Sequence, residues 1–197
     1  MTATILWMRH GTCADGYHRP NAHARPASPL TPLGACQAIH AAGRIAGNAD
    51  AIVSSTLTRA RSTARLVADH AVLTLLPADP VFEEWHAPVC VLVLTPAQYP
   101  DDYKNWRHRR TRNPDDALPG GESLTAFRDR AISAIQSAKR LGRDHGRLVV
   151  VSHRLLIGAV TALSSGTGDA IGVFEAACAF TLNPAEFHVH DLEGSPR

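Results

Sequence analysis

The chain has few cysteines and lacks the long apolar or basic segments that mark membrane and exported proteins. Its four cysteines lie far apart without a C-x-x-C pair, which argues against a zinc ribbon or a thioredoxin-like redox motif and favours reduced thiols. No run approaches the roughly 20 apolar residues that cross a bilayer, and no basic residues precede the short apolar run at the N-terminus. We therefore expect a soluble cytoplasmic protein without a membrane partner.

A strong excess of charge of either sign is also absent. The chain has 20 Lys+Arg against 18 Asp+Glu, so the charge balance does not predict non-specific binding of nucleic acid. Among the cations, arginine is far commoner than lysine. A planar guanidinium group suits bidentate recognition of phosphate or carboxylate, although a GC-rich genome produces the same bias.

The order of apolar runs predicts an α/β fold. At 197 residues and 45% hydrophobic content, the chain has the size of one domain, and we expect residues 1–197 to form a single one. Strands that alternate with helices favour a three-layer α/β/α sandwich around a mostly parallel sheet. The expected strands are 5–8, 51–53, 72–76 and 148–151, with a closing hairpin of 179–182 and 187–190, and the expected helices are 32–47, 58–70, 124–144 and 155–164.

Residues 77–119 interrupt this alternation. The segment holds many prolines, two tryptophans and the basic run from Arg107 to Arg112. We expect it to form an inserted cap with one helix over residues 96–110. Two interpretations of the basic run stay open: a solvated helix face, or a surface near the mouth of a site that selects substrates with additional negative charge.

Two of the predicted strands end in a histidine beside an arginine. Arg9 and His10 follow the first strand, and His153 and Arg154 follow the last central strand. Because equivalent ends of parallel strands lie at one edge of a sheet, the two imidazoles can converge there. A neutral imidazole is a competent nucleophile near neutral pH, and a second, protonated imidazole can share the charge of a bound phosphoryl group. Structural or surface histidines are the alternative.

Other cationic side chains carry weaker signals. Arg59 and Arg61 lie near the start of the helix that follows strand 51–53, where the helix dipole and the guanidinium groups favour an anion. A solvated helix face is the alternative for both. The scattered spacing of His23, His86 and the other loop histidines favours surface positions over metal ligation.

Five short motifs occur in the order typical of one known family. They are R-H-G at residues 9–11, L-T-P-L-G at 30–34, S-T-L-T-R-A-R-S-T at 55–63, G-G-E-S at 120–123 and V-V-S-H at 150–153. Through these motifs the chain resembles the histidine phosphatase superfamily, in its phosphoglycerate mutase-like branch. Each motif alone is a short match, whereas five in order over about three-quarters of the chain form a specific signal.

The resemblance implies roles for four of these residues. His10 is the nucleophile that accepts the phosphoryl group, while Arg9, Arg59 and His153 form the positive pocket around it. Such groups stabilise the negative charge of an in-line transition state, where most phosphoryl-transfer catalysis lies. The resemblance implies no metal ion and no other cofactor, because arginine and imidazolium groups take that place.

The family's proton donor is an acidic residue after the third strand. Here Glu83 and Glu84 are both candidates. The family pattern of an apolar residue, any residue and then the acid favours Glu84, and a carboxyl group beside Trp85 can protonate the leaving alkoxide. The alternative is a surface acidic pair at the base of the cap.

Two departures from the family pattern bear on the substrate. The turn after His10 offers Gly11 and the Thr12 hydroxyl as substrate-binding groups, but Gly16 stands where the family has a phosphate-binding asparagine. Arg154 stands where glycine commonly follows the second histidine. Its guanidinium group either narrows the pocket or reaches a second acidic group on the substrate.

Together these observations predict a metal-independent phosphomonoester hydrolase that acts on a small phosphorylated metabolite through a phosphohistidine intermediate. The short chain favours a phosphatase over a mutase, because the cofactor-dependent mutases of this family are usually longer. Three alternatives stay open: phosphoglycerate mutase-like transfer, a specialised biosynthetic reaction in the same pocket, and a non-catalytic anion-binding module. The sequence is also compatible with a homodimer.

Overall fold

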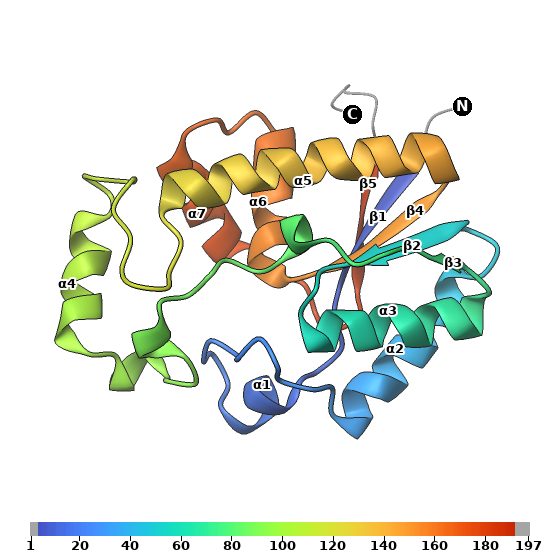
Figure 1. Cartoon of the computed structure of the whole chain (residues 1–197), viewed down its shortest axis with the longest axis horizontal. Coiled ribbons are helices and arrows are strands. Elements are labelled where there is room, and N and C mark those ends of the chain that lie inside the picture. Colours follow the sequence, from blue (N-terminus) through green and yellow to red (C-terminus); the bar gives the residue numbers. More distant parts are fainter. Residues whose placement is uncertain (1–3, 192–197) are drawn as a thin grey trace.

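The computed structural model describes residues 4–191 and has a five-stranded sheet at its centre (Figure 1). The strands are β1 (Thr4–Arg9), β2 (Ala51–Ser54), β3 (Thr74–Leu75), β4 (Leu148–Ser152) and β5 (Phe187–Asp191). They lie in the order β3-β2-β4-β1-β5. Among these described strands, β5 alone runs antiparallel to its neighbour, β1. The expected α/β fold with a mostly parallel sheet is therefore confirmed.

Helices cover both faces of this sheet (Figure 1). Helices α2 (Pro32–Ile45) and α3 (Thr58–Ala71) pack on one face, and α5 (Leu124–His145), α6 (Arg154–Ser164) and α7 (Ala170–Ala179) pack on the other. The short α1 (Ala14–His18) and α4 (Asp101–Arg109) lie away from both faces, toward the ends of β1 and β4. The sheet with its two helical layers forms the expected sandwich.

Alternation along the central strands explains the two buried layers. In β1, Ile5 and Trp7 face the layer of α5 to α7, whereas Leu6 and Met8 face α2 and α3. Strand β4 repeats this alternation with leucine and valine. A strand that is buried on both faces has a continuous apolar run, which is the pattern that predicts both strands from the sequence.

Polar caps set the start of two helices. Thr31 Oγ1 accepts a hydrogen bond from the Gly34 N–H at 3.0 Å, and Pro32 occupies the first position of α2. At α5, Ser123 Oγ accepts a hydrogen bond from the Ala126 N–H at 3.1 Å. A cap of this kind contributes about 1 kcal/mol. Both helices begin where the sequence predicts.

The expected closing hairpin is wrong. Ala179 ends α7, a helix that we did not expect, whose residues Val173, Phe174 and Ala177 are buried. Residues 180–182 form no strand. Strand β5 pairs with β1 instead, because β4 occupies one side of β1 and leaves the other edge free to form a ladder.

Other boundaries differ for local reasons. The helix expected over residues 96–110 begins only at Asp101, because Pro96 opens a separate 3-10 turn and Pro100 lacks the N–H that a helix interior needs. The third strand is shorter than expected, since Val72 takes a left-handed conformation (φ 56°) where α3 ends. Helix α1 lies in a stretch that we expected to be irregular.

Residues 77–119 pack against the core through aromatic rings. The segment forms α4 and three 3-10 turns, at Pro80–Phe82, Val89–Val91 and Pro96–Gln98. The Trp106 ring of α4 stacks on Trp85, which meets the Phe174 ring of α7 edge to face. Among residues 4–191, no helix has the length and apolar character needed to span a membrane.

Candidate active site

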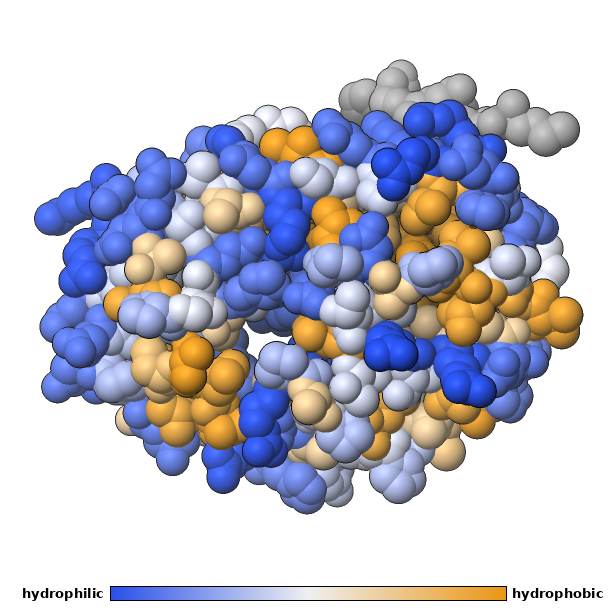
Figure 2. All heavy atoms as spheres, viewed as in Figure 1, coloured by the Kyte–Doolittle hydropathy of each residue, from blue (hydrophilic) through white to orange (hydrophobic). Residues whose placement is uncertain are grey.

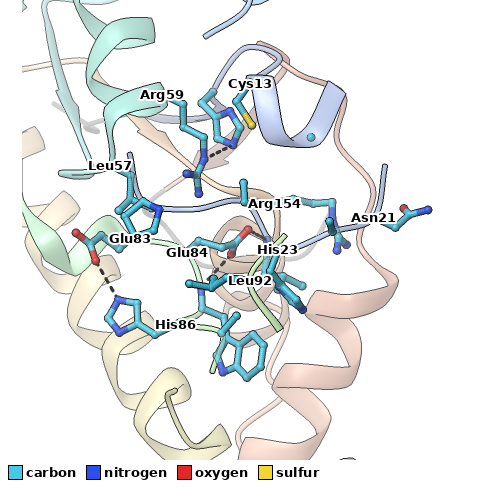
Figure 3. A pocket seen from close by; sticks show the side chains of 18 of the residues that line it. Cys13, Asn21, His23, Leu57, Arg59, Glu83, Glu84, His86, Leu92 and Arg154 are labelled. Atoms are coloured by element: carbon cyan, nitrogen blue, oxygen red, sulfur yellow. Dashed lines mark hydrogen bonds and ion pairs between the residues drawn. The ribbon is translucent and has the colours of Figure 1, made fainter. Parts of the chain in front are cut away.

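A cavity of about 470 Å³ opens at the carboxyl ends of β1 and β4. Its walls come from the turn after β1, the loop 21–26, the start of α3, the segment 83–92 and the start of α6. Figure 2 shows a hollow between the α4 end and the sheet end of the molecule, and Figure 3 shows the side chains that converge on the cavity. Ligand sites of parallel α/β sheets commonly lie at this edge.

His10 lies directly after β1 and is 7% exposed. Its Nδ1 is 2.7 Å from the Gly11 carbonyl oxygen, so Nδ1–H donates this bond and Nε2 keeps the lone pair. The Nε–H of Arg59 donates to that Nε2 at 3.1 Å. Burial and the positive charges of Arg59 and Arg9 lower the pKa of His10 well below its ordinary value. The imidazole is therefore neutral at pH 7, and the lone pair of its Nε2 accepts the hydrogen bond from Arg59.

His153 is fully buried beside His10, with 5.0 Å between the ring centroids. Its Nε2 lies 2.7 Å from Ser55 Oγ, whereas its buried Nδ1 has no hydrogen-bond partner among residues 4–191. Burial and the nearby charge of Arg59 lower the pKa of His153 as well. Its imidazole is thus neutral here, unlike the protonated imidazole expected from the sequence, because burial and neighbouring cations both penalise a further positive charge.

Two guanidinium groups give this end of the cavity its positive charge. Arg59, the second residue of α3, is 3% exposed and donates to the Arg25 carbonyl at 3.0 Å. Arg9 donates to the Leu182 carbonyl at 2.6 Å, while its buried Nε–H has no partner within the described part of the chain. Burial lowers the pKa of both side chains, and the negative charge of Glu84 acts in the opposite direction. Arginine nevertheless stays charged at pH 7.

Glu84 lines the cavity and reaches the N-terminus of α6. Its carboxylate accepts hydrogen bonds from the N–H groups of Leu155 and Leu156, at 3.4 and 3.3 Å, and from the Trp85 N–H at 3.1 Å. Free N–H groups and the dipole at a helix N-terminus attract a carboxylate. The start of α6 therefore holds Glu84 on the wall that faces the arginines.

Glu83 also lines the cavity, but its carboxylate is paired elsewhere. One oxygen accepts a hydrogen bond from Thr56 Oγ1, and the other lies 3.0 Å from His86 Nε2. Figure 3 shows the Glu83 side chain turned toward His86. Its charge acts on Arg59 more weakly than that of Glu84. The pairing of Glu83 with Thr56 and His86 thus leaves Glu84 as the acid with the stronger effect on Arg59, in agreement with the family pattern.

Arg154 lines the cavity while its guanidinium group caps a neighbouring helix. Its Nη1 donates to the carbonyl oxygens of Cys178 and Phe180, at 3.1 and 2.9 Å, at the end of α7. A cation is favourable at a helix C-terminus because the carbonyl oxygens there are negative. Helix α7 therefore fixes Arg154 in the cavity wall, so its Nη1 is not free for a second acidic group of a ligand.

The structure does not bring Gly11 and Thr12 to the cavity. The Thr12 hydroxyl donates to Gln37 Oε1 at 2.9 Å, and the Gly11 N–H donates to Thr63 Oγ1 at 3.1 Å. A Cβ on Gly11 would lie 2.4 Å from the Gly34 carbonyl oxygen. Both residues thus join the turn after β1 to α2 and α3, because the close approach of these backbones directs Thr12 away from the cavity.

The basic run of the cap also lies outside the cavity walls. Arg107, Arg109 and Arg112 are exposed, and the Arg110 guanidinium group lies 4.6 Å from the centroid of the Phe174 ring. Arg61 is likewise exposed on α3. The exposed positions agree with a solvated face, with Arg110 packed on Phe174, while the charges of Arg107 and Arg110 also act on His23 in the cavity wall.

Sequence reasoning missed three side chains of this site. Ser55 contacts His153 and was expected only near the start of a helix. Asn21 and His23 line the cavity from the loop after α1, and burial followed by nearby arginines lowers the pKa of His23 to about 4. The positive φ of Asn21 (67°) marks a turn that asparagine tolerates. An asparagine in a proline-rich loop was the one available signal.

The convergent groups suit a tetrahedral anion. A neutral imidazole and two guanidinium groups line one end of the cavity, a second imidazole is buried beside the first, and a carboxylate also lines the cavity. Donors arranged in advance around one point stabilise negative charge without reorganisation. Among residues 4–191, no three His, Cys, Asp or Glu side chains are grouped so as to hold a metal ion.

Comparison with known proteins agrees with this geometry. A family model described as the histidine phosphatase superfamily (branch 1) matches residues 5–174. A curated relative from Yersinia pestis (strain Pestoides F), named Probable phosphoglycerate mutase GpmB, is 31% identical over 137 residues, which are 66% of this chain and 60% of that protein. The match therefore spans less than two-thirds of the relative's own length.

Solved structures share the fold at low sequence identity. The alpha-ribazole phosphatase from Shigella flexneri has a TM-score of 0.76 and 20% identity, covering 96% of this chain and 91% of its own. A mycobacterial glucosyl-3-phosphoglycerate phosphatase has a TM-score of 0.75 and 24% identity, covering 95% and 90%. At such identities the likeness establishes the fold.

Proposed function

This chain belongs to the histidine phosphatase superfamily, branch 1, and from that premise we propose that it hydrolyses phosphomonoesters of small metabolites through a phosphohistidine at His10. One observation carries the proposal: the buried Arg9 Nε and His153 Nδ1 lack partners among residues 4–191, beside a neutral His10. Buried polar groups are normally satisfied. The oxygens of a phosphoryl group at His10 supply the acceptors that both groups lack.

In the first step the Nε2 lone pair of His10 attacks phosphorus, and the bond between phosphorus and the ester oxygen breaks. The Gly11 carbonyl holds Nδ1–H, which fixes the reactive tautomer and stabilises the positive charge that the ring gains. Arg9, Arg59 and His153 bind the non-bridging oxygens, whose negative charge they stabilise. A bound phosphate dianion also favours protonation of His153, which reconciles its neutral state here with the expected role.

Glu84 donates the proton that the leaving alkoxide needs. In the second step Glu84 accepts a proton from water, the water oxygen attacks phosphorus, and the bond to His10 Nε2 breaks. Inorganic phosphate leaves, and the neutral imidazole returns.

Phosphate release from a panel of small phosphomonoesters tests this proposal. Wild type, His10→Ala and the matched control His40→Ala, at an exposed position on α2, are compared with and without EDTA. We expect release by wild type and His40→Ala to survive EDTA, and release by His10→Ala to disappear. An acid-labile, alkali-stable phosphoryl label on quenched wild type identifies the phosphohistidine. Release that does not depend on His10 contradicts the proposal.

A phosphoglycerate mutase is the second candidate, because the curated relative from Yersinia pestis has that name. A mutase returns the phosphoryl group to another hydroxyl of the substrate, so the phosphate stays esterified. Interconversion of phosphoglycerate isomers without phosphate release would favour it. Binding of inorganic phosphate with no turnover of any ester would favour a non-catalytic anion-binding module.

A further inference from the structure

The G-G-E-S motif at residues 120–123 has no part in the chemistry above, yet its Glu122 forms a partly buried ion pair. Nε and Nη2 of Arg130, in the second turn of α5, donate to the two carboxylate oxygens of Glu122 at 2.8 and 2.7 Å. The two side chains are 15% and 8% exposed. Two parallel hydrogen bonds of this kind hold both groups in one geometry.

Arg130 also binds the segment that carries both cavity acids. Its Nη1 donates to the Glu83 carbonyl at 2.6 Å, and its Nη2 donates to the Glu84 carbonyl at 3.1 Å. Residues 83–86 belong to no helix or strand. Backbone carbonyls outside regular structure need partners from side chains or water, and here a single guanidinium group binds two in succession.

Glu122 binds the next two residues of the same segment. Its N–H donates to the His86 carbonyl at 2.9 Å, and its carboxylate accepts the His86 N–H at 3.3 Å. Its carbonyl accepts the Trp85 indole N–H at 3.0 Å. The ion pair therefore contacts every residue from 83 to 86, while neither of its members lines the cavity.

We propose that Arg130 and Glu122 form a clamp that positions the Glu84 carboxyl group for proton transfer, an inference that rests on the proposed function. Proton transfer needs the donor within about 2.6–3.2 Å of the leaving oxygen. Without the clamp, an irregular segment lets the carboxyl group leave that range. The loss of rate then depends on how much the leaving group needs a proton.

The test compares Arg130→Lys with the matched control Arg128→Lys on the same helix. Lysine keeps a positive charge beside Glu122, but its single ammonium group cannot span both carboxylate oxygens and both carbonyls. Arg128 bonds to Asp129 and to the Gly168 carbonyl, away from the segment. Each variant is assayed on p-nitrophenyl phosphate, whose leaving group departs without a proton, and on an alkyl phosphate, whose alkoxide needs one.

We expect Arg130→Lys to lower kcat/KM on the alkyl phosphate by about 10- to 100-fold, since general acid catalysis contributes this much or more, with little change in kcat/KM on p-nitrophenyl phosphate. We compare kcat/KM because it reports the step that forms the phosphohistidine and not the later hydrolysis, which is common to both esters. Arg128→Lys should match wild type on both esters. Equal losses on the two esters, or no loss on either, would overturn the clamp as a positioning device.

Hydrogen exchange of residues 81–86 provides a readout that is independent of turnover. Faster exchange in Arg130→Lys than in Arg128→Lys supports the clamp, and unchanged exchange in an active protein contradicts the clamp alone. A wild-type protein that hydrolyses neither ester contradicts the proposed function, and with it the catalytic role of the clamp, whatever the exchange shows. The two failures are therefore distinguishable.

Discussion

Replacing Ser55 by alanine tests whether a buried hydroxyl orients His153. Ser55 is fully buried, and its Oγ lies 2.7 Å from His153 Nε2. Since Nδ1 of the same ring already lacks a partner among residues 4–191, the substitution leaves both ring nitrogens unsatisfied by the described protein. A buried polar group without a partner costs about 1–3 kcal/mol, so we expect the free energy of unfolding to fall by that amount.

The same substitution should slow phosphate release. If about 1–2 kcal/mol of the interaction between His153 and the transferring phosphoryl group is lost, kcat falls by about 5- to 30-fold. Ser54→Ala is a matched control at the adjacent position. Ser54 is also buried, but its Oγ donates to the Ser55 carbonyl at 2.9 Å. The control should lose about 1 kcal/mol of stability without a comparable fall in kcat.

Urea unfolding followed by tryptophan fluorescence measures the stability of both variants, and initial rates at saturating substrate give kcat. The decisive quantity is the difference between the two serine variants. If Ser55→Ala and Ser54→Ala lose equal stability and both keep the wild-type kcat, the reasoning that Ser55 orients a reacting His153 is refuted.

Two further predictions concern the turn after β1. Gly11→Ala places a Cβ 2.4 Å from the Gly34 carbonyl oxygen and should lower the free energy of unfolding by about 1–3 kcal/mol. Gly43→Ala, where nothing lies within 4 Å of the new Cβ, should raise the free energy of unfolding by about 1 kcal/mol. Urea unfolding measures both variants, and an equal change in the free energy of unfolding for Gly11→Ala and Gly43→Ala would contradict this reasoning. Hydrogen bonds from Arg25 lower the pKa of Asp15 from 3.8 to about 2, so its stabilisation is complete above about pH 4 and is lost as the pH falls toward 2. The Tm difference between wild type and Asp15→Asn should shrink over that range, and a difference independent of pH would count against the assignment.

Periodicity and turn chemistry predict most of the sheet and its edge. Continuous apolar runs give β1 and β4, and a parallel arrangement then places His10 and His153 at one edge without knowledge of any contact. Arg59 follows β2 by the same logic. The prediction of these three positions depends only on where strands end, which is local information. The structure brings the three side chains together.

What the sequence could not predict depends on side-chain direction between distant elements. The bond between Ser55 and His153 joins residues 98 positions apart, and the Thr12 hydroxyl turns to Gln37 because α2 packs against the turn after β1. The partner of β5 is set by which strand edge stays open after β4 has paired. A pattern of apolar residues has no information on such choices.

The position of β1 between β4 and β5 makes assembly of the site a late event in folding. Strand β1 leads directly to His10, the proposed nucleophile, and is synthesised early, yet both of its neighbours come from the other end of the chain. Pairings so distant in sequence close long loops and slow folding. A nascent chain that ends before residue 148 has neither His153 nor a partner for its apolar first strand. Such a chain exposes an unpaired, aggregation-prone strand edge, and the site cannot assemble before β4 and His153 have left the ribosome.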